Sequence, residues 1–70
     1  MFDYTLLKKR MKELRFKQYD IAEATGKSRA TISAALNGDR EFTQTEILNI
    51  AKLLQINDKE ISRYFFYIKT

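Results

Sequence analysis

The sequence predicts a small all-α domain built from five helices. Apolar residues recur at helical spacing through most of the chain, proline is absent, and the two glycines stand where helices are expected to end. A chain of 70 residues makes one domain, so residues 1–70 are treated as a single unit.

The first helix is expected at about residues 4–15. Asp3 is its expected N-cap, because a carboxylate can accept hydrogen bonds from the N–H groups that open a helix. Leu7, Met11 and Leu14 lie on one face at i, i+4 and i+7, and lysines fill most of the other positions. This face is expected to meet the core.

Two short helices joined by a tight turn are expected next, at about residues 18–25 and 29–36. Gly26 ends the first of them, since a residue without Cβ adopts the left-handed conformation at low cost. Ser28 caps the second, and Asn37-Gly38 stops it. This arrangement, over about 18–37, is a helix-turn-helix, whose second helix fits a DNA major groove. The residues expected to face inward are Ile21, Ala22, Ile32 and Leu36.

Two further helices complete the set. Thr43 and Glu46 form a T-x-x-E capping box, so the fourth helix is expected to start near Gln44. Asn57 and Glu60 form a similar start for the fifth helix. The apolar positions expected to face the core are Ile47, Ile50, Ala51, Leu54, Ile61 and Phe65.

The C-terminal segment 64–70 carries an unusually apolar run. Consecutive positions point in different directions in a helix or a strand, so a domain of this size cannot bury all of them. Two interpretations stay open: two of the run's residues fill the core between the first and last helices, or the run forms a protein–protein surface, where aromatic residues are favoured. The run consists of Tyr64, Phe65, Phe66, Tyr67 and Ile68.

Composition argues against several classes of function. The chain has no cysteine and no histidine, which removes disulfides, thiolate metal sites and the commonest general base. Ser28 and Ser33 therefore have no histidine to activate them, and we expect no enzyme activity, no metal and no cofactor. Apolar runs are far shorter than the roughly 20 residues that span a bilayer, and no secretory signal is visible. We expect a cytoplasmic location.

The net charge of +4 is unevenly placed: the whole excess falls within residues 1–19. A basic patch favours a polyanion, with nucleic acid as the first candidate. The alternative interpretation is an ordinary solvated helix face.

The pattern from Gln18 to Gly38 resembles the helix-turn-helix of the Cro and cI repressor family of phage and bacterial regulators. The resemblance covers nearly the whole chain, and the short length and the opening residues 1–4 look like the small Cro-type regulators of phages from Gram-positive hosts. It implies a lambda-repressor-like fold. The residues that carry the pattern are Gln18, Ala22, Gly26, Ser28, Ile32, Ser33, Asn37 and Gly38.

The resemblance also implies DNA-contacting roles. Arg29 is the strongest candidate for reading a base, because arginine bonds bidentately to O6 and N7 of guanine, although phosphate contact or plain exposure is the alternative. The positions expected to meet base edges are Arg29, Ala30 and Ser33. The positions expected to contact phosphate are Gln18, Lys27, Ser28, Asn37 and Arg40.

Two functional hypotheses follow. The first is a Cro-type transcriptional regulator that binds double-stranded operator DNA as a homodimer, with the helix at 29–36 in the major groove. The second is an antirepressor, a modulator that binds a partner repressor protein through the same domain. Asp39 and Glu41 motivate the second, because they place acids where related repressors often carry bases. The single long polar side chain on that helix and the apolar run also favour a protein partner.

Overall fold

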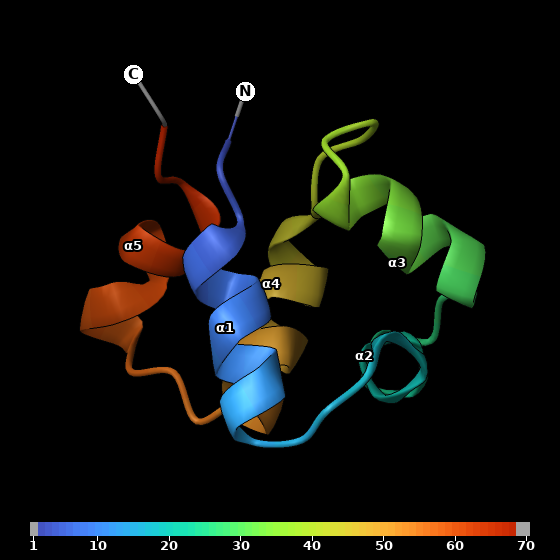
Figure 1. Ribbon diagram of the computed structural model, residues 1–70, viewed down its shortest axis with the longest axis horizontal. Coiled ribbons are helices and arrows are strands. Elements are labelled where there is room, and N and C mark those ends of the chain that lie inside the picture. The colour runs from blue at the N-terminus through green and yellow to red at the C-terminus, as the bar shows by residue number, and fades with distance from the viewer. Residues whose placement is uncertain (1, 69–70) are drawn as a thin grey trace.

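The computed structural model describes residues 2–68 of the 70-residue chain. The predicted all-α architecture of five helices is confirmed (Figure 1). Within the described range, the only strand-like pairing is a single antiparallel bridge between Phe2 and Ile68. The helices are α1 (Thr5–Glu13), α2 (Gln18–Thr25), α3 (Arg29–Leu36), α4 (Gln44–Leu53) and α5 (Ile61–Phe65), with a short 3-10 helix at Asp58–Glu60 before α5.

The helices pack around one hydrophobic core. α2 packs against both α3 and α4, while α1 packs against α5 on the other side of the molecule (Figure 1). Leu14 and Ile61, both predicted to face inward, are only partly buried at the edge of the core. The core also takes in Tyr4, Ala35 and Ile56, which the helical pattern did not single out. The predicted positions that are buried are Leu7, Met11, Ile21, Ala22, Ile32, Leu36, Ile47, Ile50, Ala51, Leu54 and Phe65.

One of two predicted helix starts is observed as expected. Asp3 Oδ1 accepts the Thr5 N–H at 2.8 Å, but Tyr4 and not Asp3 occupies the N-cap position of α1, which is also shorter than the predicted span. The capping box of α4 is complete: the Glu46 N–H donates to Thr43 Oγ1 at 3.1 Å, and the Thr43 N–H donates to Glu46 Oε1 at 2.9 Å. Local side-chain chemistry therefore fixes where these helices begin.

The predicted start of the fifth helix is only partly right. Asn57 Oδ1 accepts the Lys59 N–H at 2.9 Å, but the turn that follows is a 3-10 helix. Glu60 does not complete a capping box, because its carboxylate pairs with Arg63 at 2.9 Å instead. As a result α5 begins only at Ile61 and is a short helix of 5 residues.

The first four helices end in the same way. After each, one residue has positive φ, and two backbone N–H groups turn back to carbonyls of the last turn, which is the Schellman arrangement. Glycine takes this position after α2 and α3, with φ of 70° at Gly26 and 85° at Gly38. After α1 and α4 the position falls to Arg15 (φ 62°) and Gln55 (φ 56°), whose Cβ atoms make the conformation costly.

Replacing Gln55 by glycine should therefore stabilise the protein. Gln55→Gly removes the strain of holding a residue with a side chain in the left-handed conformation. This gain in stability is partly offset by the greater freedom of glycine in the unfolded chain. We expect the free energy of unfolding to rise by about 0.5–1 kcal/mol. Urea denaturation of both proteins measures it. Gln55→Ala is the matched control and should bring no gain, so equal stability of the two variants would contradict the interpretation.

Candidate nucleic-acid interface

The turn between α2 and α3 has the left-handed glycine and the serine cap predicted for it. The Lys27 N–H donates back to the Ala22 carbonyl at 3.0 Å, across the left-handed Gly26. A Cβ placed on Gly26 would meet no atom within 4 Å, so backbone conformation and not space requires the glycine. Ser28 Oγ accepts the Thr31 N–H at 3.1 Å and starts α3 at Arg29.

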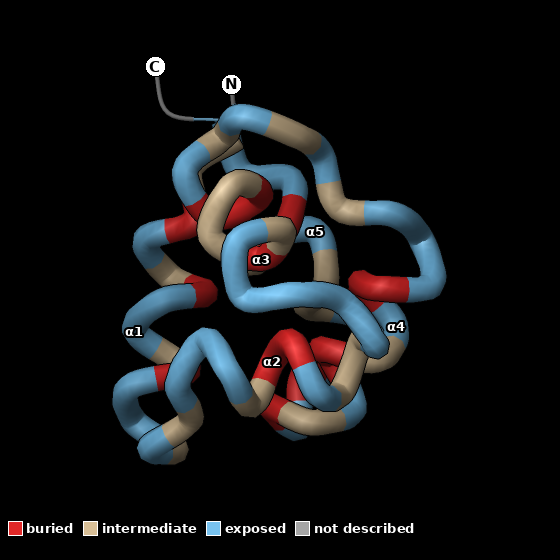
Figure 2. Tube along the Cα trace, turned by 90° about the vertical axis from the view of Figure 1, so that its right-hand side faces the viewer, coloured by how far each residue is buried: buried red, intermediate tan, exposed pale blue. Residues whose placement is uncertain are grey.

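The three residues expected to meet base edges all lie on α3. Arg29 and Ala30 are exposed at its N-terminal end, and Ser33 is half-buried one turn later. The opposite side of the helix is buried through Ile32 and Leu36. Figure 2 shows α3 and α2 on the side of the molecule that faces the viewer, and within α3 the exposed residues are Arg29 and Ala30 at its N-terminal end. The helix is held by one face and leaves the other open.

The candidates for phosphate contact lie at the ends of α2 and α3. Gln18 is the first residue of α2, Lys27 and Ser28 immediately precede α3, and Asn37 follows it. All four are exposed. Helix N-termini favour anions because their N–H groups and dipole point outward.

Arg40, the fifth phosphate candidate, is engaged within the protein. Its Nη2 lies 2.8 Å from Glu46 Oε2, Nε donates to the Thr31 carbonyl at 3.3 Å, and Nη1 donates to the Glu41 carbonyl at 2.7 Å. The guanidinium therefore joins the loop after α3 to α4. Arg40 therefore has a structural role in place of the expected phosphate contact. The sequence could not reveal this role, because Glu46 was already accounted for by the capping box.

Glu46 is the one buried charged residue among residues 2–68, with 1% of its surface exposed. Burial alone would raise the pKa of its carboxyl group. Hydrogen bonds from Arg40 and from the Thr43 N–H, together with the charges of Arg40 and Lys27, outweigh burial and lower the pKa. The carboxylate is therefore held ionised in the folded protein.

The C-terminal apolar run divides between core and surface. Phe65 is 1% exposed and packs edge-to-face on Phe42 at 5.8 Å, so of the two places predicted for it, the core is confirmed and the protein interface is not. Tyr64 is half-buried against the core. Phe66, Tyr67 and Ile68 are exposed, at 47%, 56% and 58% respectively. Residues 69–70, the end of the predicted tail, lie outside the described part of the chain.

A family model described as a protein of unknown function, DUF739, matches residues 1–67. The chain belongs to this family. A search of curated proteins gave no match.

Two general features of this DUF739 domain bear on its chemistry. Among residues 2–68, no three His, Cys, Asp or Glu side chains gather into a group that could hold a metal ion. No helix in the same range has the length and apolar character needed to cross a bilayer.

The Glu46 site predicts a defined dependence of stability on pH. Because folding lowers the pKa of Glu46, its contribution is full above the unfolded value of about 4.3 and is lost as pH falls through the folded value. Glu46→Gln should cost about 2 kcal/mol at neutral pH, since a charged hydrogen-bond acceptor is lost. The difference from wild type should shrink as pH falls below the unfolded value and through the lowered folded one.

Urea denaturation at neutral and acidic pH measures this difference. Glu23→Gln, a change at an exposed glutamate on α2, is the control and should stay within about 0.5 kcal/mol of wild type. A gap between wild type and Glu46→Gln that is unchanged in acid would refute the ionised, paired state of Glu46.

Proposed function

We propose that this DUF739 protein is a DNA-binding transcriptional regulator that inserts α3 into the major groove of double-stranded operator DNA in the bacterial cytoplasm. One observation carries the proposal: the α2–turn–α3 unit leaves Arg29 and Ala30 exposed on a helix whose opposite face is anchored in the core. A helix held in this way suits insertion into a groove that is about 12 Å wide.

Arg29 supplies most of the base reading in this proposal. Its guanidinium forms no ion pair among the described residues, so it is available to a guanine edge. Ala30 offers a methyl group for a thymine methyl, and Ser33 a hydroxyl that discriminates poorly. With so few readers, phosphate contacts from Gln18, Lys27 and their neighbours supply much of the affinity, which should therefore depend strongly on salt.

The proposed regulator is a homodimer on its operator. Two-fold symmetry would place the two α3 helices in half-sites about 34–36 Å apart, one turn of DNA. We assign the dimer contact to Phe66, Tyr67 and Ile68, because contiguous exposed apolar residues mark association surfaces.

A second candidate function, the antirepressor, is favoured by the acids after α3. Asp39 and Glu41 are both exposed, and they repel phosphate where a DNA-binding protein would gain from attraction. In this alternative the exposed face of α3 binds a partner repressor instead of DNA. The two candidates predict different consequences for the loss of Arg29.

Arg29→Ala should weaken binding to the preferred operator about 10- to 100-fold and relax the preference at one base pair. The operator is first selected from random duplexes with the full chain, and affinity is then measured by fluorescence anisotropy at two salt concentrations. Arg63→Ala is the matched control: it removes the same charge from α5, which lies on the opposite side of the molecule from α3 (Figure 1), and should leave affinity unchanged.

Failure to bind any duplex at low salt, with the protein shown to be folded, would count against the regulator. If Arg29→Ala abolished DNA binding but left regulation intact in a reporter strain, the antirepressor would be the better account.

The dimer contact is tested by replacing Phe66 and Tyr67 together with serine. The exposed pair can be changed without opening the core, whereas a chain shortened after Arg63 would lose the buried Phe65. We expect sedimentation equilibrium to give a dimer for the wild type and a monomer for the double variant. Equal masses for the two proteins would remove the tail from the interface.

A further inference from the structure

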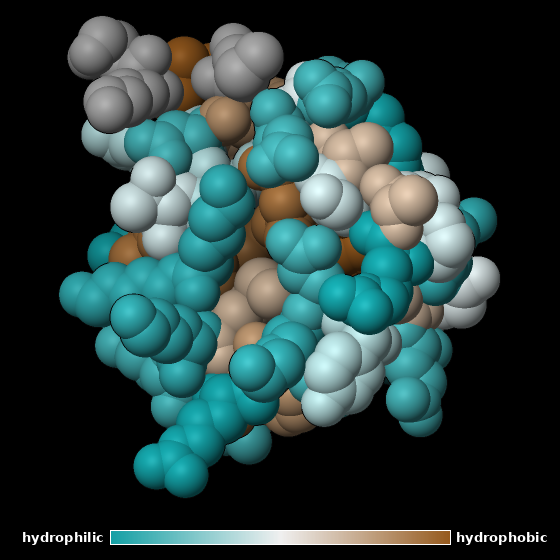
Figure 3. All heavy atoms as spheres, turned by 45° about the vertical axis from the view of Figure 1, so that its right-hand side comes forward, coloured by the Kyte–Doolittle hydropathy of each residue, from teal (hydrophilic) through white to brown (hydrophobic). Residues whose placement is uncertain are grey.

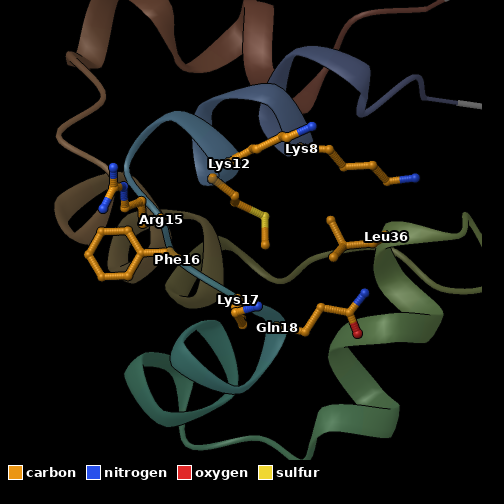
Figure 4. Close-up of a pocket in the computed structure, with 8 residues that line it drawn as sticks. Lys8, Lys12, Arg15, Phe16, Lys17, Gln18 and Leu36 are labelled. Carbon is orange, nitrogen blue, oxygen red and sulfur yellow. The ribbon is translucent and has the colours of Figure 1, made fainter.

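A hollow of about 500 Å³ opens between α1 and the start of α2, beside the end of α3 (Figure 4). Three apolar side chains and four cationic ones, with one glutamine, surround it. Figure 3 shows apolar surface set in a recess between hydrophilic side chains on this part of the molecule. The lining residues are Lys8, Met11, Lys12, Arg15, Phe16, Lys17, Gln18 and Leu36.

The floor of the hollow is apolar because of how α1 ends. The left-handed Arg15 turns the chain so that the Phe16 N–H donates back to the Met11 carbonyl at 2.8 Å. This turn brings the Phe16 ring to the edge of the core, where it lines the hollow together with Met11 and Leu36; Phe16 and Leu36 lie on opposite sides of it (Figure 4). Phe16 remains half-buried, so apolar surface stays accessible from the hollow.

The rim is basic and has no internal counter-charge. Lys8 and Lys12 lie one turn apart on α1, and Arg15 and Lys17 flank the turn that leads to α2. All four are exposed, and none forms an ion pair within residues 2–68. No carboxylate lines the hollow. The like charges repel one another until an anionic partner arrives.

We propose that this hollow docks an acidic segment of a partner protein that carries one large apolar side chain. The apolar side chain of the segment fills the floor, and the carboxylates on either side of it meet the three lysines and Arg15 of the rim. Protein interfaces commonly combine a buried apolar anchor with a charged periphery in this way. The inference goes beyond the proposed operator binding and does not rest on it, since α3 contributes only Leu36 at the edge.

Other occupants match the hollow less well. The sugar–phosphate exterior of a duplex would satisfy the cations but offers no large apolar group for the floor. A small molecule would need a site that buries about 70–90% of its surface, whereas this one is open to solvent along one side (Figure 3). A peptide helix or strand can cover an open groove while inserting a single side chain.

The test uses the full chain and a fluorescein-labelled peptide in which glutamates flank a single phenylalanine anchor. Fluorescence anisotropy should give saturable binding. Two control peptides, with the anchor replaced by serine or the glutamates by glutamines, should each bind about tenfold more weakly. Amide NMR shifts should map the peptide to the end of α1 and the start of α2.

Matched charge reversals on α1 locate the site. Lys8→Glu should weaken the peptide about tenfold, whereas Lys9→Glu, the neighbouring residue outside the hollow, should leave its affinity unchanged. Lys12→Glu gives a second test should Lys8→Glu unfold, as judged by circular dichroism.

Three results would overturn the proposal. The first is absence of peptide binding. This includes the case in which Lys8→Glu weakens the binding of a DNA duplex alone, which would mean that the hollow contacts the backbone of DNA. The second is equal binding by the Lys8→Glu and Lys9→Glu variants. The third is equal binding of the peptide that lacks the apolar anchor, which would reduce the interaction to unspecific charge attraction.

Discussion

The buried carboxylate of Glu46 links the segments that position α3. One of its oxygens accepts the Thr43 N–H and so starts α4, and the other accepts from Arg40 in the loop that follows α3. Arg40 also donates to the carbonyl of Thr31, within α3 itself. Through these contacts the beginning of α4 and the first turn of α3 are tied to a single buried group. A buried charge left without its partner is costly, so the arrangement favours one placement of α3 over others.

The molecule divides its surface into regions of different chemistry. α2 presents Tyr19 and Glu23, α3 presents Arg29 and Ala30, α1 presents a row of cations, and the end of the chain presents three exposed apolar residues. These surfaces lie around a core too small to stabilise the domain by more than about 3–5 kcal/mol. Single contacts such as the Arg40–Glu46 pair and the left-handed turns therefore represent a large fraction of the net stability.

The sequence predicted those parts of the fold that local chemistry determines. The bounds of α2 and α3 agree with expectation because Gly26 and Ser28 act on backbone groups within a few residues of themselves. The left-handed Arg15 and Gln55 were not foreseen, since neither residue type signals a positive φ. Their conformations follow from the helices on either side, which pack the next residues, Phe16 and Ile56, against the core.

The candidate site also contains some features that the local sequence predicted and others that it did not. The exposure of Arg29 and Ala30 followed from helical periodicity, because the buried positions of α3 are spaced at one turn. The Arg40 side chain points toward the carboxylate of Glu46, six positions away. The sequence pattern indicated only a helix-capping role for that carboxylate. Phe65 and Phe66 are adjacent and chemically identical; Phe65 lies one helical turn after Ile61 and was expected to face the core, where it packs on Phe42, whereas Phe66 is exposed. The charge of the basic hollow followed from the excess within residues 1–19, but the contribution of Leu36 from α3 could not be read from any local pattern.

The pairing of the two ends of the chain has a practical consequence. Phe2 bridges to Ile68, and the Asp3 N–H donates to the Tyr67 carbonyl at 2.7 Å, so the first and last described residues are neighbours. A short linker could close the backbone into a ring, or new termini could be opened in an exposed loop, without moving any helix. Ring closure would reduce the entropy of the unfolded chain while leaving α3 untouched. By the same geometry, an affinity tag fused next to Phe2 or next to Ile68 would lie close to the exposed residues Phe66 and Tyr67.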